Sequence, residues 1–367
     1  MNFEMPKYRH PDFKQEFLKD APNCRLETVE RDGISPRHYH ALSVYPEYFK
    51  INGTWVLATQ SRMDTVCVAR DTPGRERVEI VEFRNLKKGD KVVIGRTEDA
   101  SEGIYVWTQG FLAETATADT FAFREGRSRE TAYSLDYDTL YEVLRYEREH
   151  RGYVTLVVGT ALALDQNSRL ALERLIRNSY VQALFCGSET AAFDLERGVF
   201  GTSWGQKVFE HEQNTTYNLY DTINLANSYG SLEALVASGK VKDGFVKACV
   251  ECGTALVMAG TIRDRLALPG VYNNVYAAQN AMRVHARRTS TMIMMSAVLY
   301  TIATGNMTPS YNEFDGVVRP VYMYTVDVQE FAVNKLSDRG TVTAVSMVTN
   351  AQDFVRNLDR ALNKPRD

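Results

Sequence analysis

The apolar positions of the chain change their spacing near residue 130. Before that point, short strand-type runs alternate with turn residues. NGTWVLAT follows Asn52-Gly53, VCVARDTPGRERVEIVEF surrounds Pro73-Gly74, and KKGDKVVIG ends in an apolar run. Asn-Gly and Pro-Gly pairs are typical of tight turns between antiparallel strands. Residues 1–130 are therefore predicted to form a small, mainly β domain of short strands.

After residue 130 the pattern alternates between strands and amphipathic helices. A first helix is expected between residues 124 and 150, and another at 168–180 with Ser168 as its N-cap. The expected strands are the β-branched, apolar runs at residues 153–159, 181–186, 254–260, 291–297, 321–328 and 341–349. This alternation predicts an α/β domain over residues 131–367, with a parallel Rossmann-like sheet covered by helices on both faces.

One strand leads into a polar segment. TMIMMSAVLYTIATGNMTPS, Thr291 to Ser310, begins as an apolar run and continues with Thr304, Gly305, Asn306 and Thr308. We expect a buried strand followed by a flexible loop. In an open parallel sheet, ligands bind outside the carboxyl ends of the strands. Spacing alone leaves a plain core strand and its turn as an equally good interpretation.

Length and charge narrow the choice of partners. A chain of 367 residues suggests two domains, and a net charge of −3 with scattered basic residues argues against nucleic-acid binding. No stretch has the form of a signal peptide or membrane helix, so we expect a cytoplasmic protein with a small-molecule partner. Five unevenly spaced cysteines do not suggest disulfides. The helical segment 215–251 is expected to form a cap or a contact in a homo-oligomer.

Two strand ends offer cofactor chemistry. The first strand runs into Gly159 without the GxGxxG pattern of a dinucleotide site. The second ends in Gly187-Ser188-Glu189, where a helix N-terminus would favour an anion, although a plain strand-to-helix turn fits as well. Asp327 ends a later strand and can accept hydrogen bonds from the ribose hydroxyls of NAD. An N-cap role for Asp327 is equally compatible.

Candidate substrate groups follow another strand. Arg263 can hold a carboxylate and Asp264 an amine, and a structural ion pair is the competing interpretation. Asp194 is a further polar candidate. Cys249 and Cys252 form a CxxC without a second pair, so no metal site is predicted.

Several motifs in order carry a resemblance to a known family. The chain resembles the NAD-dependent ornithine cyclodeaminase domain of the LOR/SDH family, which occurs alone in archaea and behind an arginine dihydrolase in cyanobacteria. The matching motifs are AGTIRD (259–264), AQNAMR (278–283), TIATGNMTPS (301–310), KLSDRG (335–340), YFKINGTWV, Met63-Asp64 and KKGDKVVIG. The resemblance covers about residues 34–362, and it implies a sheet like that of deoxyhypusine synthase with bound NAD.

The resemblance also implies a reaction. Hydride leaves the α-carbon of ornithine for NAD, the distal amine attacks the resulting imine, ammonia departs, and the returned hydride gives proline. By position, the implied cofactor contacts are Ser188, Glu189, Ala297, Val298, Leu299, Tyr300, Asp327, Asn350 and Ala351.

The chain departs from the family pattern at several positions. Relatives have a His within segment 191–194, another His at Tyr300, a Gly-rich, His-containing turn in place of 161–167, and an acidic residue at Arg265. Segment 311–319 looks inserted. These differences favour, as an alternative, a diverged enzyme that oxidises or condenses another amine, and a non-catalytic NAD-binding scaffold is a third interpretation. We assign no general base.

Overall fold

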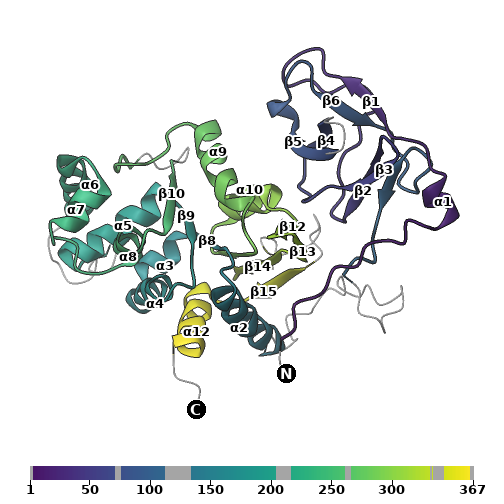
Figure 1. The fold of residues 1–367 in the computed structure, drawn as a ribbon. Helices are drawn as coiled ribbons and strands as arrows, with labels where there is room; N and C mark the ends of the chain where they lie inside the picture. The colour runs from purple at the N-terminus through teal and green to yellow at the C-terminus, as the bar shows by residue number, and fades with distance from the viewer. Residues whose placement is uncertain are drawn as a thin grey trace.

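The chain folds into a β lobe and a larger α/β lobe, seen in a computed structural model (Figure 1). The structure describes residues 3–70, 76–111, 134–203, 216–260, 266–330, 333 and 343–363. The predicted change of architecture is present, because the described β region ends at residue 111 and the first helix of the α/β lobe starts at Ser134. The boundary predicted at residue 130 lies outside the described residues.

The α/β lobe is built on a six-stranded sheet in the order β10-β9-β8-β11-β14-β15. Its strands are β8 (Val154–Val158), β9 (Ala183–Gly187), β10 (Ala255–Ala259), β11 (Thr291–Met295), β14 (Tyr322–Asp327) and β15 (Ala344–Val348). All neighbouring pairs are parallel. The predicted α/β class with a parallel Rossmann-like sheet is therefore confirmed.

Side chains of each strand alternate between two apolar layers. Leu156 and Val158 of β8 face the larger core cluster, whereas Val157 faces a smaller cluster with Met282 and Met307. A strand that is buried on both faces has a continuous run of apolar residues, and this run made the strands predictable from the sequence.

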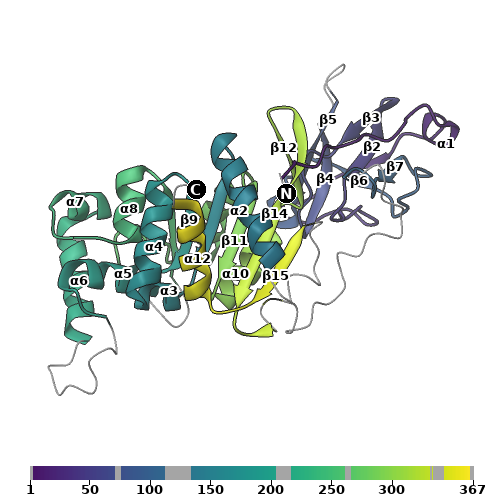
Figure 2. The same ribbon diagram turned by 90° about the horizontal axis from the view of Figure 1, so that it is seen from below.

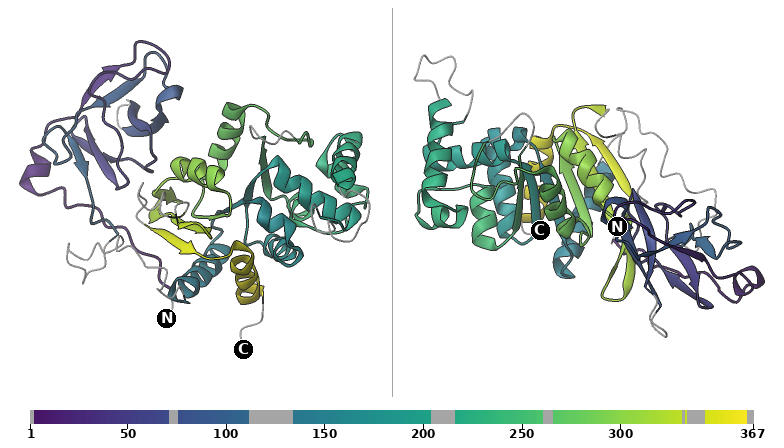
Figure 3. Two further views of the ribbon diagram at one scale, coloured as in Figure 1. Left: turned by 180° about the vertical axis from the view of Figure 1, so that it is seen from behind. Right: turned by 90° about the horizontal axis from the view of Figure 1, so that it is seen from above.

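The helices divide between the two faces. The larger layer contains α2 (Ser134–Glu149), α3 (Thr160–Leu164), α4 (Gln166–Arg177), α5 (Ser188–Phe200), α8 (Phe245–Cys252) and α12 (Ala351–Asn363). The smaller layer contains α9 (Val275–Ala286) and α10 (Val298–Met307). Helices α6 (Thr216–Tyr229) and α7 (Leu232–Ala237) lie at the end of the molecule opposite the β lobe (Figures 1 and 3).

The β lobe contains two antiparallel sheets. One has the order β1-β6-β4-β5 and the other β3-β2-β7. Their strands are β1 (Arg25–Thr28), β2 (Glu47–Ile51), β3 (Thr54–Leu57), β4 (Thr65–Arg70), β5 (Arg77–Glu82), β6 (Lys91–Ile94) and β7 (Ile104–Val106), with α1 (Glu16–Lys19) and the short 3-10 helix η1 (Phe83–Asn85) beside them. Asn52 and Gly53, with φ of 49° and 80°, form the predicted turn between β2 and β3.

A hairpin of the α/β lobe joins the two lobes. Strands β12 (Tyr311–Phe314) and β13 (Val317–Pro320) correspond to the segment that looks inserted, and this hairpin extends toward the β lobe (Figure 2). Asn312 forms an isolated antiparallel bridge with Gln60 there. The fully buried Tyr311 donates a hydrogen bond of 2.7 Å from its Oη to the Ala58 carbonyl oxygen. Ser310 N donates to Ser61 O at 3.0 Å. The hairpin thus fixes the β lobe beside helix α10.

Two local expectations were wrong. The segment after β11 is not a loop, because residues Val298–Met307 form helix α10, in which Thr304 and Gly305 are buried. Burial of this face outweighs the low helix propensity of Gly, about 1 kcal/mol relative to Ala. Ser168 is not an N-cap either. Asp165 caps α4, since its carboxylate accepts a hydrogen bond from Ser168 N at 2.7 Å.

Candidate active site

The strand order places a change of direction at the carboxyl edge of the sheet, between β8 and β11. The chain adds β9 and β10 on one side of β8, then crosses to β11, β14 and β15 on the other side. The loops after β8 and β11 therefore leave in opposite directions, which is the topological switch point at which ligands bind in such sheets. We call this the ligand edge.

The two central loops meet at Gly159. Its backbone N donates to Met295 O at 2.9 Å, and a Cβ on Gly159 would lie only 1.7 Å from the carbonyl oxygen of Ser296. Ser296 itself has a φ of 49°. A side chain at position 159 would force the loops apart, so this glycine sets their approach at the switch point.

Helices α5 and α10 begin at the ligand edge with N-caps that have no side-chain acceptor. These residues are Gly187 and Ala297. In contrast, Asp165 caps α4 and Asn274 caps α9 through side-chain oxygens. First-turn N–H groups that no cap side chain satisfies, together with the helix dipole, attract an anion such as a pyrophosphate. The ligand edge thus offers two helix N-termini to a phosphate-bearing ligand.

Tyr300 belongs to the first turn of α10, and its side chain extends across the ligand edge. Its Oη donates a hydrogen bond of 3.0 Å to Ala259 O at the end of β10. The same Oη is 3.2 Å from the position that a Cβ on Gly187 would occupy. The phenol ring therefore covers the ends of β9 and β10, while its neighbour Leu299 is 80% exposed.

Two polar residues end the strands on the other side. Asp327 closes β14 and is only 8% exposed, and its Oδ1 accepts a hydrogen bond from Gln329 N at 2.9 Å. Asn350 precedes α12, where its Oδ1 accepts from Gln352 N at 2.8 Å. Asp327 thus has a contact of the capping kind that competed with its cofactor role, and Asn350 has a similar one. The structure brings together, at one edge, the predicted cofactor residues Gly187, Ser188, Glu189, Ala297, Val298, Leu299, Tyr300, Asp327, Asn350 and Ala351.

Asp194 is in the second turn of α5 and makes structural contacts there, so its role as a substrate group stays a prediction. It is fully buried in α5, where its carboxylate accepts from Arg169 Nε at 2.6 Å and from Val246 N at 2.9 Å. Burial raises the pKa of Asp194 to about 6, although Arg169 and the amide donors oppose that shift. The carboxylate therefore fastens α4 and the start of α8 to α5.

The other two predicted substrate residues, Arg263 and Asp264, lie outside the described residues. Strand β10 before them ends at Ala259, on the ligand edge. Their role stays a prediction.

A cleft of about 440 Å³ opens between the β lobe and the helices α9 and α10. We call it the interlobe cleft. It is lined by Arg62, Met63, Asp64, Glu82, Phe83, Arg84, Gln279, Arg283, Ala303, Asn306 and Met307. The sequence alone indicates no function for these residues. Three of the motifs that match the family, Met63-Asp64, AQNAMR and TIATGNMTPS, contribute residues to this cleft. These motifs were the signal in the sequence that pointed to the region.

Glu82 is the centre of a charge cluster at this cleft. Arg287 Nη2 donates to both of its carboxylate oxygens, at 2.9 and 2.7 Å, and Arg62 Nη2 is 3.2 Å from Oε1. Arg283 Nε is 3.3 Å from the same oxygen. Burial opposes ionisation of Glu82, but Arg62 and Arg287 outweigh it and lower the pKa to about 2.

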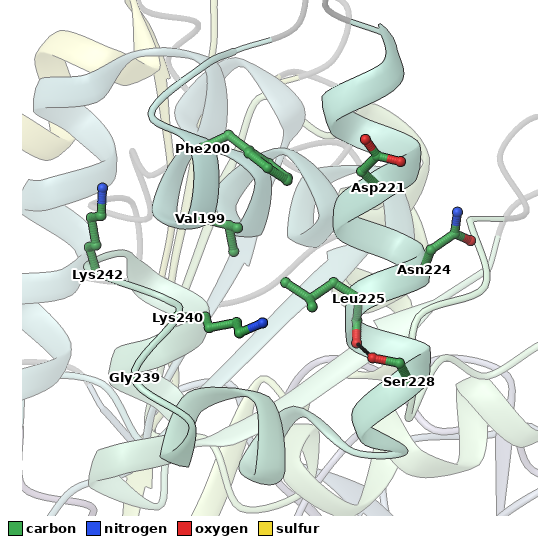
Figure 4. A pocket seen from close by; sticks show the side chains of 9 residues that line it. All are labelled: Val199, Phe200, Asp221, Asn224, Leu225, Ser228, Gly239, Lys240 and Lys242. Carbon is green, nitrogen blue, oxygen red and sulfur yellow. Dashed lines mark hydrogen bonds between the residues drawn. The ribbon is translucent and has the colours of Figure 1, made fainter.

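A second hollow lies among the peripheral helices, between α5, α6 and the segment after α7 (Figure 4). Phe200, Leu225 and Lys240 point into it. It lies at the C-terminal end of α5, whereas the N-terminus of that helix is at the ligand edge.

Within the described ranges, no cluster of three or more His, Cys, Asp or Glu side chains is arranged to hold a metal ion. Cys249 is buried and Cys252 is exposed on α8. None of the helices in the part of the chain that the structure describes is long and apolar enough to cross a membrane.

Two family models match the chain. The model described as the C-terminal Rossmann fold of ArgZ-like arginine dihydrolase matches residues 139–358, and the first region of the same C-terminal part matches residues 46–129. A solved structure of a conserved LOR/SDH protein from Methanococcus maripaludis is 28% identical, with a TM-score of 0.77 over 94% of this chain and 98% of that chain.

Two named relatives are similar in sequence. Ornithine cyclodeaminase of Methanocaldococcus jannaschii is 31% identical over 95% of this chain and 79% of its own length. The bifunctional arginine dihydrolase/ornithine cyclodeaminase AgrE of Nostoc is 30% identical over 94% of this chain, which spans only 48% of that longer protein. The resemblance read from the motifs is confirmed: the chain belongs to the ArgZ-like C-terminal family, with the archaeal ornithine cyclodeaminases among its relatives.

Proposed function

We propose that the chain is an NAD-dependent enzyme that converts a diamino acid through an imine, with L-ornithine as substrate and proline and ammonia as products. The observation that carries this proposal is the ligand edge. Two uncapped helix N-termini and the carboxylate of Asp327 meet there around one switch point.

The residues at this edge suit a dinucleotide. The N-termini of α5 and α10 would hold the pyrophosphate, as the Gly-rich loop does in other Rossmann folds. Asp327 would accept the ribose hydroxyls, because Oδ1 binds only one backbone N–H and the carboxylate has several acceptor sites. A carboxylate at this position repels an additional 2′-phosphate, so NAD is favoured over NADP.

When bound, NAD supplies a hydride acceptor for the α-carbon of an amine. The protein must then orient the substrate and keep water from the imine. Tyr300 covers the ends of β9 and β10 with a half-buried ring. No described residue is assigned here as the general base.

The relatives give support to the substrate and the cofactor. AgrE has been solved in a ternary complex with ornithine and NAD+, and the matching part of that structure is 28% identical with a TM-score of 0.56. Several relatives are named ornithine cyclodeaminase. These names describe those proteins, and ornithine conversion by this chain is the proposal.

A different amine is the second candidate, and Tyr300 favours it. The phenol replaces a residue that is His in the family pattern, and its hydrogen bond to Ala259 O commits it to a structural contact. An enzyme with Tyr at this position can still bind the cofactor at the ligand edge, but it lacks an imidazole that could transfer a proton.

The test is to incubate the purified protein with NAD and L-ornithine, then measure proline, ammonia and the absorbance of reduced nicotinamide. We expect proline and ammonia without a lasting rise in absorbance, since the hydride returns to the product. Turnover of another diamine with no proline from ornithine would favour the second candidate. Bound NAD with no turnover of any offered amine would contradict both.

A further inference from the structure

Three motifs that are far apart in the chain line the interlobe cleft. Met63-Asp64 comes from the β lobe, Gln279 and Arg283 come from α9, and Asn306 comes from the end of α10. The α/β lobe and the β lobe contribute to one cavity, so the cleft exists only when the lobes are docked. The hairpin contact between Tyr311 and Ala58 holds them in that arrangement.

Positive charge is in excess at this cleft. Arg62, Arg84 and Arg283 line it, and Arg287 donates a hydrogen bond to Glu82. The carboxylates are Glu82, which these arginines share, and the exposed Asp64. Four guanidinium groups against two carboxylates leave a net charge of +2. A buried or half-buried cation is costly unless an anion pairs with it.

Several polar atoms in the cluster have no hydrogen-bond partner in the described chain. Arg62 is 3% exposed, yet its Nε is buried without a hydrogen-bond partner, and the same holds for Nε of Arg287. Arg283 Nε makes no hydrogen bond either, and its contact is the ion pair with Glu82 at 3.3 Å. Asn306 Oδ1 is also buried and unpartnered, and Asn306 lines the cleft. Buried donors and acceptors of this kind are expected to meet a ligand or ordered water.

The electrostatics of the arginines favour an anion at this cleft. Burial lowers the pKa of Arg62 to about 10 against the attraction of Glu82, and Arg287 and Arg283 lower it further. Burial and the neighbouring Arg84 also lower the pKa of Arg283. An anion bound among these groups would relieve the mutual repulsion of the cations.

We infer that the interlobe cleft binds the carboxylate of an amino-acid substrate, with Arg283 as its main partner and Asn306 as a partner for the adjacent amino group. The inference rests on the proposed function and names the substrate-binding surface for it. A planar guanidinium matches a carboxylate in shape and charge. An amide oxygen accepts from an amine or ammonium. Arg62 and Arg287 then act through Glu82, which holds the cluster in place.

Helix α10 connects this cleft to the ligand edge. Tyr300 is in its first turn at the edge, and Ala303 lines the cleft. Three residues span about 4.5 Å along a helix axis. A diamino acid held by its carboxylate near Arg283 can therefore extend along α10 toward the edge where the proposed cofactor binds.

The size and walls of the cleft fit this ligand class. A volume of about 440 Å³ is in the range for small metabolites. Met63, Phe83 and Met307 provide apolar walls for the methylene groups of a diamino acid.

The test compares L-ornithine with putrescine, the diamine that lacks its carboxylate, and with inorganic phosphate. Binding to the NAD-loaded protein is measured by calorimetry for the unchanged chain, Arg283→Gln and Arg288→Gln. Arg288 is the matched control, because it is exposed near the end of the same helix and stacks on Tyr153 outside the cleft. We expect Arg283→Gln to weaken ornithine binding by about ten- to a hundredfold, the effect of losing a charged hydrogen bond, and Arg288→Gln to leave it unchanged.

Three results would overturn the inference. These are equal binding of putrescine and ornithine, binding of phosphate alone, and an ornithine affinity and KM that stay unchanged in folded Arg283→Gln. If Arg283→Gln does not fold, Ala303→Phe fills the cleft without changing its charge, and normal ornithine binding by this variant would likewise contradict the inference.

The same experiment separates this inference from the proposed function. Ornithine binding that depends on Arg283, with no proline formed, leaves the site intact and contradicts the proposed reaction. If proline forms and Arg283→Gln does not change the KM for ornithine, the proposed reaction stands and the proposed carboxylate site is contradicted.

Discussion

Tyr300 ties helix α10 to strand β10, because its phenolic Oη donates a hydrogen bond of 3.0 Å to the carbonyl oxygen of Ala259. The two residues belong to elements on opposite sides of the switch point, with β8 and β9 between them in the sheet order. This single contact closes the ligand edge over the ends of β9 and β10 and holds the first turn of α10 in place.

Tyr300→Phe is expected to lower the free energy of unfolding by about 1 kcal/mol, because the Ala259 carbonyl loses its side-chain donor. Chemical denaturation measures the change. Tyr217→Phe on α6 is the control, since Tyr217 is 61% exposed. Equal stability of the two variants would show that the hydrogen bond does not stabilise the edge.

Asp327→Ala is expected to weaken NAD binding by at least about tenfold, since the carboxylate can take up two ribose hydroxyls. Asp327→Asn is the comparison variant, because an amide Oδ1 still accepts from Gln329 N and preserves the turn after β14. Both variants should lose affinity in a fluorescence titration. If Asn binds NAD as well as Asp while Ala does not, the role of Asp327 is the turn and not the ribose.

Asp194→Ala is expected to cost about 3–5 kcal/mol of stability, because it removes the fully buried carboxylate that pairs with the buried Arg169 and leaves Asp243, itself 37% exposed, as the carboxylate partner among the described residues. Asp353→Ala on α12 should change stability by less than about 0.5 kcal/mol, since that side chain is 69% exposed. A stable, folded Asp194→Ala protein that lost only activity would support the prediction of Asp194 as a substrate group.

Stability should fall in acid because of Glu82. Its pKa is lowered from 4.5 to about 2, so the native state binds this proton more weakly than the unfolded chain does. The contribution is fully present above pH 4.5 and is lost as the pH falls toward 2. A shift of this size corresponds to about 3 kcal/mol.

Denaturation at a series of pH values measures this contribution. Glu82→Gln should be less stable at neutral pH and should lose less stability between pH 4.5 and 2. An unchanged acid slope in this variant would show that other carboxylates dominate the acid transition.

The sequence predicted the sheet well because its strands are buried on both faces. Thr291–Met295, for example, is fully buried, and its apolar residues form an unbroken run that is typical of a buried strand. The turn at Asn52-Gly53 was predicted because its positive φ values restrict the residue choice. Local chemistry determines both features.

Tertiary burial explains the misses. Helix α10 contains Thr304, Gly305 and Asn306, whose propensities indicate a loop, and only packing against the sheet makes the segment helical. The buried contacts of Asp194 were not predicted, because the sequence does not show that Arg169, in another helix, reaches its carboxylate.

The interlobe cluster was invisible for a different reason. Arg62, Glu82 and Arg287 are spread over more than half of the chain, and no local spacing relates them. Their contact depends on how the β lobe docks on α9. Only the matching motifs around Arg283 and Asn306 pointed to the region.

The proposed reaction removes hydrogen from the α-carbon of a diamino acid and returns it to the product. The most direct measurement uses L-ornithine deuterated at the α-carbon, with the NAD-loaded protein and mass spectrometry of the product. We expect proline that retains the deuterium, released with an equal amount of ammonia. Absence of proline and ammonia from protein that demonstrably holds NAD would contradict it.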